Sequence, residues 1–300
     1  MRHIFITGGT GFFGKSILDY RLRHAEFLRD AKLTILSRDP EGFVAANPLL
    51  ARQDGVSFIQ GDVRNFAFPK QSFDSISHAA TSAVTTLSDE EMTSTIMDGT
   101  RHVVNFAKAC KAKQILFTSS GAVYGPQTAA VDETAATSPN TAYGRGKLAA
   151  ERICCESGIA AKIARCFAFT GPYLNRRIHF AIGNFIQACI DNRPIVISGD
   201  GTPFRSYLYA DDLVEWLFAV LERGEPNRPY NVGSPDGLSI RKLAEAVRDA
   251  LGTTNEIIVK GTPMADVKPS VYVPVTTRAE TELGLTVRTN LSAAIRQSIR

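Results

Sequence analysis

The sequence predicts an α/β fold in which a doubly wound parallel sheet carries helices on both faces and a smaller α/β region follows. Three observations predict it. Short β-branched runs alternate with longer helix-patterned stretches from residue 3 to about residue 165. The chain has 300 residues, 44% of them hydrophobic, which is enough to bury a full core. After Gly171 and Pro172 the rhythm changes, which indicates a second unit.

The strands of the first unit are expected where β-branched residues cluster between helix-patterned stretches. They are residues 3–7, 32–37, 56–60, 75–78, 114–119 and 161–165. Farther along, helices are expected over AIGNFIQACI and over residues 211–222, with a short strand, PIVIS, between them. We therefore expect residues 1–165, completed by about 203–235, to form the first domain, and residues 166–300 to form mainly the second.

The composition argues against several classes of protein. The formal net charge is only +4, and Lys and Arg are scattered among acidic residues without the basic stripe of a nucleic-acid surface. No apolar run approaches the ~20 residues that a membrane helix needs, and the start shows no signal-peptide pattern. The five cysteines lack the C-x-x-C spacing of zinc sites and the density of a disulfide scaffold. We expect a cytoplasmic protein with reduced thiols, no bound metal and a small anionic ligand.

A glycine-rich turn, ITGGTGFFG, follows the first expected strand and opens a helix. Gly8, Gly11 and Gly14 have the spacing G-x-x-G-x-x-G. Residues without a Cβ let the backbone N–H groups at the start of the helix approach a pyrophosphate closely. The flanking strand and helix favour this interpretation over an ordinary flexible turn. The stretch therefore predicts a Rossmann-type dinucleotide site that includes Gly8, Gly11, Phe12, Phe13 and Gly14.

A second pattern joins LFTSSGAVYG to AYGRGK downstream. Tyr143 and Lys147 are four residues apart, so on a helix both side chains lie on one face. Such a pair alone is usually a solvated helix pair, but here it accompanies the glycine turn. An adjacent ammonium stabilises a phenolate, and a hydroxyl at Ser120 can stabilise charge on a carbonyl oxygen. Ser119 is the alternative, although its side chain should point the other way if the strand continues to Ser120.

The glycine turn, Ser120 in SSGAVYG and the Tyr143-x-x-x-Lys147 pair together resemble a known family over almost the whole chain. It is the extended short-chain dehydrogenases that act on nucleotide sugars, the NAD-dependent epimerase/dehydratases. The resemblance implies that Tyr143 is the general acid or base. It implies that Lys147 lowers the pKa of Tyr143 and holds the nicotinamide ribose, and that Ser120 hydrogen-bonds the reacting oxygen.

The same resemblance implies further cofactor contacts in two short segments. QGDV, after the third strand, resembles the adenine contact and gives Asp62 and Val63, with a loop-capping role as the alternative for Asp62. HAAT resembles the backbone beside the nicotinamide side of the cofactor, where Ala79 and Ala80 are small enough for close approach. His78 is expected to be packed or locally hydrogen-bonded and not catalytic.

The substrate side is expected in the second half of the chain. GNFI and GDGTPFRSYLYADDL resemble the segments that hold a nucleotide diphosphate, which implies roles for Asn184 and Arg205. A guanidinium fork suits phosphate oxygens, although a surface ion pair is the alternative for Arg205. His179 is the titratable candidate near the sugar, with a merely structural role as its alternative.

The sequence departs from the family directly after Ser120. The family's 4,6-dehydratases and uronate decarboxylases carry acids there, whereas this chain has Gly121 and Ala122. Members that epimerise at C3 and C5 often carry a cysteine after the serine, and Gly121 cannot serve that role. The residues expected after the serine for dehydratase, decarboxylase or 3,5-epimerase activity are therefore missing from this chain.

The second strand ends in an unusual way, LTILSR. NAD-preferring relatives end it with a carboxylate that binds the ribose hydroxyls and repels a 2′-phosphate. Here Ser37 can hydrogen-bond such a phosphate and Arg38 can pair with it, so NADP(H) is expected to be preferred, with NAD(H) possible as the alternative. Asp39 would be presented to the ribose if the strand ended one residue later.

Cofactor preference bears on the reaction that we expect. A reductase exchanges its cofactor and draws on NADPH, whereas a 4-epimerase regenerates a bound cofactor that is usually NAD. We therefore expect NADP(H)-dependent reduction of a nucleotide-linked 4-keto-6-deoxy sugar. The alternative is a nucleotide-sugar 4-epimerase. A remote alternative is a non-catalytic dinucleotide-binding sensor, which has no need of Ser120, Tyr143 and Lys147 together.

We also expect a homodimer. The helix-patterned stretches 92–110 and 141–155 resemble the paired interface helices of the family, although their apolar positions could equally belong to the core. No nucleic-acid or membrane partner is expected.

Overall fold

The computed structural model describes residues 2–80, 88–176, 180–264 and 267–299. By its internal contacts the chain divides into two compact units. Unit 1 comprises residues 1–125, 136–166 and 214–230, and unit 2 comprises residues 126–135, 167–213 and 231–300. The catalytic and cofactor candidates of the sequence lie in unit 1, and the substrate candidates Asn184 and Arg205 lie in unit 2.

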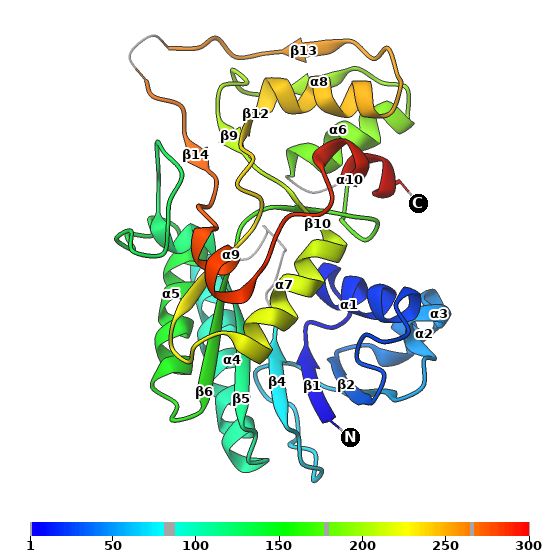
Figure 1. The fold of residues 1–300 in the computed structure, drawn as a ribbon, viewed down its shortest axis with the longest axis vertical. Helices are drawn as coiled ribbons and strands as arrows, with labels where there is room; N and C mark the ends of the chain where they lie inside the picture. The colour runs from blue at the N-terminus through cyan, green and yellow to red at the C-terminus, as the bar shows by residue number, and fades with distance from the viewer. Residues whose placement is uncertain (1, 81–87, 177–179, 265–266, 300) are drawn as a thin grey trace. The chain divides into compact units, whose positions relative to one another are not determined.

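Unit 1 is built on a seven-stranded sheet with the order β11-β6-β5-β4-β1-β2-β3 (Figure 1). Its strands are β1 (Arg2–Thr7), β2 (Ala31–Ser37), β3 (Val56–Gln60), β4 (Ser75–His78), β5 (Gln114–Ser120), β6 (Ala160–Cys166) and β11 (Pro229–Val232). Strands β1 to β6 pair in parallel. The six strands expected from the sequence and the doubly wound fold are confirmed.

The strand order reverses between β1 and β4, and this reversal places helices on both faces of the sheet. Right-handed crossovers from β1 to β2 and from β4 to β5 run in opposite directions, so their helices cover opposite faces. The helices are α1 (Phe12–Arg23), α2 (Pro40–Ala46), α3 (Pro48–Ala51), α4 (Asp89–Ala109), α5 (Ala142–Cys155) and α7 (Ala210–Arg223), with a 3₁₀ turn, η1 (Gly121–Tyr124). Figure 1 shows α4 and α5 together beside β5 and β6.

The core of unit 1 forms because alternate strand residues point to the same face of the sheet. Phe5, Ile76, Ile115 and Phe117 are at most 1% exposed and pack in one cluster with α4 and α5. On helix α4 they meet Phe106, which is fully buried. This packing fixes α5 against β5, and these two elements carry the serine, tyrosine and lysine of the candidate site.

Unit 2 consists of short strands and helices around a separate core. They are β7 (Phe169–Thr170), α6 (Ala181–Ile190), β8 (Ile195–Ile197), β9 (Phe204–Arg205), β10 (Leu208–Tyr209), β12 (Leu238–Ser239), α8 (Ile240–Ala250), β13 (Ile257–Val259), β14 (Val271–Tyr272), α9 (Thr277–Leu283) and α10 (Leu291–Gln297). Helices α6 and α8 pack against each other and bury Ile182, Phe185 and Leu243. The smaller α/β region expected from the sequence is therefore present.

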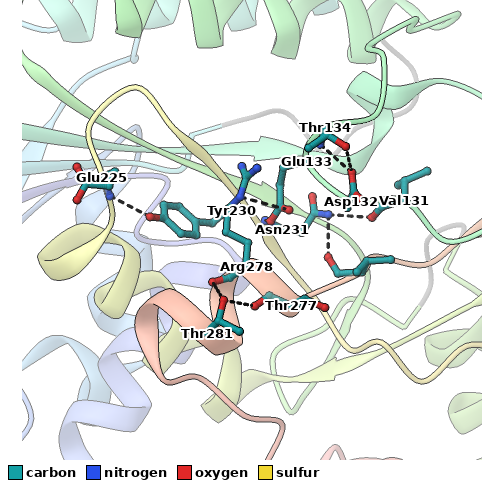
Figure 2. Close-up of polar contacts among 11 residues, drawn as sticks. Val131, Asp132, Glu133, Thr134, Glu225, Tyr230, Asn231, Thr277, Arg278 and Thr281 are labelled. Carbon is teal, nitrogen blue, oxygen red and sulfur yellow. Dashed lines mark hydrogen bonds and ion pairs between the residues drawn. The ribbon is translucent and has the colours of Figure 1, made fainter.

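Residues 126–135 belong to unit 2 although they lie in the chain between Ser120 and Tyr143. Figure 2 shows how Asn231 fastens this segment. Its amide nitrogen donates to the carbonyls of Val131 and Val275 at 3.0 and 3.1 Å. Its backbone N–H donates to the Glu133 carboxylate at 2.7 Å.

The same carboxylate is nearly buried and lies 3.7 Å from a guanidinium nitrogen of Arg278 (Figure 2). Asn231 and Arg278 therefore hold a segment, PQTAAVDETA, that has little apolar surface of its own.

Membrane spans and metal sites are both absent from the part of the chain that the structure describes. Across the described ranges, no helix is long and apolar enough to cross a membrane. In the same ranges, no three or more His, Cys, Asp or Glu side chains gather as a metal site would require.

Asn231→Leu should lower the free energy of unfolding by about 1–3 kcal/mol, because buried carbonyls lose their donor. The control is Thr281→Ala, drawn in the same close-up, which removes a hydroxyl bonded at 2.8 Å on the exposed face of α9. Urea unfolding of both variants measures the difference. Equal, small effects would contradict the role given to Asn231.

Candidate functional site

The glycine turn after β1 is shaped by contacts that leave no room for a Cβ. A Cβ on Gly8, where φ is +73°, would lie 2.6 Å from the carbonyl carbon of Ala79. A Cβ on Gly14 would lie 2.1 Å from the Cα of Gly9. Gly11 caps α1 without a side-chain hydrogen bond, and the first turn of α1 has no acidic residue. The turn and its helix terminus therefore fit a pyrophosphate.

This turn lies where ligands bind in open α/β sheets, at the carboxyl ends of two adjacent strands on either side of the order reversal. Gly8 follows β1, and Ala79 and Ala80 follow β4. The N–H of Ala79 donates to the carbonyl of Thr7 at 3.2 Å. Phe12 and Phe13, at the start of α1, are half-buried.

A directed chain of hydrogen bonds holds the segment after β4. The N–H of Ala80 donates to the Thr7 hydroxyl, which lies 2.8 Å from Nδ1 of His78. Nε2 of His78 lies 3.0 Å from the hydroxyl of Thr100, whose own proton goes to the carbonyl of Ile96. Thr100 can then only accept, so His78 carries its proton on Nε2 and accepts at Nδ1 from Thr7.

His78 is therefore a neutral, structural histidine, as expected from the sequence. Burial lowers its pKa to about 3, and the charge of Lys147 acts in the same direction.

The candidate Ser, Tyr and Lys come together at the end of β5. The strand continues to Ser120, whose side chain is hydrogen-bonded to Tyr143 and accepts from the N–H of Ala122 at 3.2 Å. Lys147 donates from Nζ to the carbonyl of Thr118 at 2.7 Å. The same Nζ lies 5.8 Å from the ring centre of Tyr143. Three side chains from a strand and a helix thus share one edge, where Ser120 and Lys147 are buried and Tyr143 is half-buried.

Burial dominates the protonation of this edge. It raises the pKa of Tyr143 to about 12, and the hydrogen bond from Ser120 opposes it. Burial also lowers the pKa of Lys147 to about 8. At neutral pH the phenol therefore holds a proton that it can donate, and the ammonium keeps its charge.

Ser119, the alternative serine, has other partners. Its hydroxyl donates to Oε1 of Glu151 at 2.5 Å. Arg165 binds both oxygens of that carboxylate, with Nε at 3.0 Å and Nη2 at 2.9 Å. The sequence patterns did not single out Glu151 or Arg165. A signal for Glu151 was available, because it follows Lys147 by four residues on the same helix face.

At the end of β2, the carboxylate that could replace Arg38 at the ribose, that of Asp39, already has a hydrogen-bond partner in the chain. Asp39 caps α2, and its Oδ1 accepts from the N–H of Gly42 at 2.9 Å. The N–H of Asp39 donates to the Ser37 hydroxyl at 3.2 Å, and that hydroxyl still has its own proton to donate. Arg38 is exposed at the same strand end.

Asp62, a candidate adenine contact, is held by an arginine that the sequence patterns did not single out. Its Oδ1 accepts from Nε of Arg64 at 2.8 Å and from the backbone N–H of Arg64 at 3.0 Å. Hydrogen bonding to Arg64 lowers the pKa of Asp62, and the charge of Arg38 contributes. Val63 packs against the core beside Gly99. Two guanidinium groups therefore flank one carboxylate at this edge of the sheet.

The substrate candidates that the structure describes lie in unit 2. Asn184 is exposed on α6. Arg205, on β9, donates from Nη1 to the carbonyl of Phe204 at 2.7 Å, and its guanidinium lies 5.8 Å from the ring centre of Tyr272. His179 lies outside the described residues.

Comparison with known sequences gives one family and a set of distant relatives. The model of the NAD dependent epimerase/dehydratase family matches residues 4–233. UDP-glucuronic acid decarboxylase 6 of Arabidopsis thaliana is 29% identical over 277 residues, covering 87% of this chain and 78% of the relative. The dTDP-D-glucose 4,6-dehydratase of Mus musculus is 27% identical over 275 residues, covering 85% and 74%.

Solved structures of similar fold cover nearly the whole chain. UDP-glucuronic acid 4-epimerase from Bacillus cereus, in complex with UDP-glucuronic acid and NAD, superposes with a TM-score of 0.86 at 21% identity, covering 99% of this chain and 98% of that one. UDP-glucose 4-epimerase from Thermotoga maritima, with UDP-glucose, gives 0.84 at 20% identity, covering 99% and 97%.

The neutral state of His78 predicts an acid sensitivity. The folded pKa of about 3 lies below the ordinary 6.5, so between these values the unfolded chain binds more protons and stability falls as pH falls. Between pH 7.5 and 5, wild type should lose about 2 kcal/mol more unfolding free energy than His78→Gln.

Urea unfolding at the two pH values measures this, and His24→Gln, on an exposed residue, is the control that should keep the wild-type dependence. The same pH dependence in wild type and His78→Gln would contradict the assignment.

Proposed function

Because the chain belongs to the NAD dependent epimerase/dehydratase family, we propose that it is a nucleotide-sugar 4-epimerase. In this reaction C4 of the sugar is oxidised and then reduced from the opposite face. The observation that carries the proposal is the set of Ser120, Tyr143 and Lys147 at the end of a β5 that continues into Gly121 and Ala122.

The residues after Ser120 favour one of the three activities that are named among the relatives. The relatives are named as decarboxylases, dehydratases and 4-epimerases. Decarboxylases and dehydratases of the family are expected to carry an acid directly after the serine, where this chain has Gly121 and Ala122. Epimerisation at C4 needs a proton carrier, a hydrogen-bond donor to the sugar oxygen and a bound dinucleotide, and no further acid.

Each residue has a role that follows from its surroundings. When bound, an oxidised nicotinamide supplies a hydride acceptor and a positive charge, and its reduced form supplies a hydride donor. Tyr143 exchanges the proton of the 4-hydroxyl group, and Ser120 hydrogen-bonds the same oxygen. Lys147, fixed on the carbonyl of Thr118, provides a positive charge beside the phenol. Gly8, Gly11 and the start of α1 receive the pyrophosphate.

We propose further that the cofactor carries a 2′-phosphate. Ser37 and exposed Arg38 offer a hydroxyl and a guanidinium at the end of β2, where the ribose would lie, and Asp39 is engaged as the cap of α2. Asp62 and Val63 would adjoin the adenine, and Ala79 and Ala80 the nicotinamide side. The cofactors named in the related structures are NAD, so this preference would set the chain apart from them.

The second candidate is the expectation drawn from the sequence, a reductase of a nucleotide-linked 4-keto-6-deoxy sugar. Two observations favour it: the Ser37-Arg38 strand end, and a Tyr143 phenol that keeps its proton at neutral pH. It has less support than the epimerase, because the relatives described above bear the names of decarboxylases, dehydratases and epimerases and not of ketoreductases.

The substrate contacts in unit 2 are proposed from family resemblance. Arg205 would bind the diphosphate, with its guanidinium supported by Tyr272 and the carbonyl of Phe204. Asn184 would supply an amide, and His179 would lie near the sugar.

Proton NMR of the purified protein incubated with UDP-glucose or UDP-glucuronic acid tests the function. The epimerase should produce the C4 epimer without added cofactor. A protein that acts only on a 4-keto sugar, and only with added NADPH, would be the reductase. Dinucleotide binding without any turnover on these substrates would support the sensor and contradict both enzymes.

Tyr143→Phe should reduce kcat by about 10²–10⁴-fold while leaving dinucleotide affinity nearly unchanged, because only the proton-carrying oxygen is lost. Tyr230→Phe is the control, since Tyr230 is a buried tyrosine whose hydroxyl accepts from the N–H of Glu225 at 3.1 Å. Steady-state kinetics and fluorescence titration measure the two quantities. Wild-type kcat in Tyr143→Phe would reject Tyr143 as the proton carrier.

Arg38→Ala should weaken NADPH binding by about tenfold to a hundredfold and leave NADH binding unchanged, because only NADPH loses a charge-assisted bond. Arg52→Ala, an exposed arginine after α3, is the control for general charge. Titration of both cofactors against each variant provides the test. If wild type bound NADH as tightly as NADPH and Arg38→Ala affected neither, the 2′-phosphate proposal would fail.

We propose a homodimer through α4 and α5. Their deeply buried positions, such as Phe106 and Ala150, belong to the core of unit 1, which leaves half-buried Leu148 on α5 for a partner. Light scattering should give twice the mass of one chain, and the mass of one chain at micromolar concentration would reject the dimer.

A further inference from the structure

Glu151 is a buried carboxylate that the proposed reaction does not use. It lies on α5, eight residues after Tyr143 and four after Lys147, so all three side chains share one helix face. The side chains of Glu151 and its partner Arg165 are each 8% exposed. A buried ion pair is costly to desolvate, and well-packed apolar residues often replace one without loss of stability. Stability alone therefore does not explain why this pair lies here.

The pair connects the three elements that form the reacting edge. Glu151, on α5, accepts from Ser119 at the end of β5 and from two nitrogens of Arg165 at the end of β6. In the sheet, Ser119 pairs with Arg165, and Ser120 pairs with Cys166. The carboxylate thus fixes the residue directly before Ser120 and the strand directly beside it.

Arg165 also holds the residues that follow Ser120. Its guanidinium carbon lies 4.9 Å from the ring centre of Tyr124, in η1, and the two side chains are hydrogen-bonded. Burial alone would lower the pKa of Arg165, but its bonds to Glu151 raise it above the usual range, so the guanidinium remains charged. Ser120 is therefore bracketed by Ser119 before it and Tyr124 after it, both bound to the same ion pair.

We propose that Glu151 and Arg165 are positioning residues that set Ser120 against Tyr143 and Lys147. This inference rests on the proposed function only in that these three side chains form the reacting site. It assigns the ion pair to catalysis through geometry, and neither residue touches the substrate.

The charge of Glu151 also affects the pKa of Lys147, which gives the proposal a second, independent test. Burial lowers the pKa of Lys147, and Cys166, Cys154 and Glu151 oppose it in that order. Burial raises the pKa of both thiols, that of Cys166 to about 12, so both are uncharged at neutral pH.

Two more groups face Lys147, and both are neutral at pH 7. They are His78 on β4 and Tyr143 on α5. Of these five neighbours, the carboxylate is Glu151, and it is ion-paired with Arg165. Removing the charge of Glu151 should let Lys147 lose its proton at a lower pH.

The test compares Glu151→Gln, which keeps the shape and removes the charge, with Glu151→Asp, which keeps the charge. Lys162→Met is the matched control: Lys162 is buried on the same strand β6 and donates to the carbonyl of Gly224, away from Ser120. For each protein, kcat, KM and dinucleotide affinity are measured from pH 6 to 10, with unfolding free energy alongside.

Glu151→Gln should lower kcat by about tenfold to a hundredfold with KM nearly unchanged, because misplaced reacting groups lose rate before affinity. In the pH profiles of kcat and of dinucleotide binding, the decrease on the basic side, here called the basic limb, should occur about one pH unit lower. Glu151→Asp should restore the limb. Lys162→Met should lose stability and keep both kcat and the limb.

Two results would overturn the proposal: an unchanged kcat and limb in Glu151→Gln, or a similar loss of kcat in Lys162→Met. If Glu151→Gln does not fold, Ser119→Ala removes only the link to Ser120, and wild-type kcat in that variant would overturn the proposal. The pH dependence of dinucleotide binding needs no substrate. If the protein shows no turnover but the basic limb of dinucleotide binding still shifts in Glu151→Gln, the proposed function is contradicted and the inference stands.

Discussion

The close approach of the glycine turn to the segment after β4 is the constraint on which the rest of the site depends. With a Cβ at Gly8, the turn would meet the backbone of Ala79 and Ala80. The turn can therefore lie directly over the reversal of strand order, with the start of α1 at the same edge of the sheet. Thr7 and His78 hold the other side of this contact by hydrogen bonds that need neutral His78.

Burial then decides what the reacting residues can do. It keeps the proton on Tyr143 and brings the pKa of Lys147 near 8, so small changes in nearby charge alter the protonation of Lys147. Glu151 places a carboxylate near Lys147, and its ion pair with Arg165 supplies a fixed framework at this edge. A site of this kind is sensitive to the residues behind it, because a displacement of Ser120 changes the hydrogen bond to Tyr143 directly.

Periodicity and local motifs predicted most of the fold and much of the candidate site. Strand alternation placed the six parallel strands, and β5 continues to Ser120, as the choice of Ser120 over Ser119 required. The capping role of Asp39 could have been inferred from the Pro that follows it, since Pro is favoured in the first turn of a helix.

Long-range contacts could not be predicted in this way. Asn231 holds Val131, one hundred residues earlier in the chain, and no local pattern indicates that residues 126–135 join unit 2. Arg165 was missed for the same reason, because its neighbours Glu151 and Tyr124 are brought to it only by the fold, whereas the partner of Arg64 lies two residues away. The expected ketoreductase depended on the cofactor inferred from two residues, and the names of the relatives favour the epimerase instead.

The most direct test of the central claim is to denature the purified protein and identify what it releases by mass and absorbance. A 4-epimerase that regenerates its cofactor at the glycine turn should release about one dinucleotide per chain, and Ser37 with Arg38 predicts that this dinucleotide carries a 2′-phosphate. Protein that releases no dinucleotide, and turns over only when NADPH is added, would contradict the claim that the cofactor is retained through the reaction.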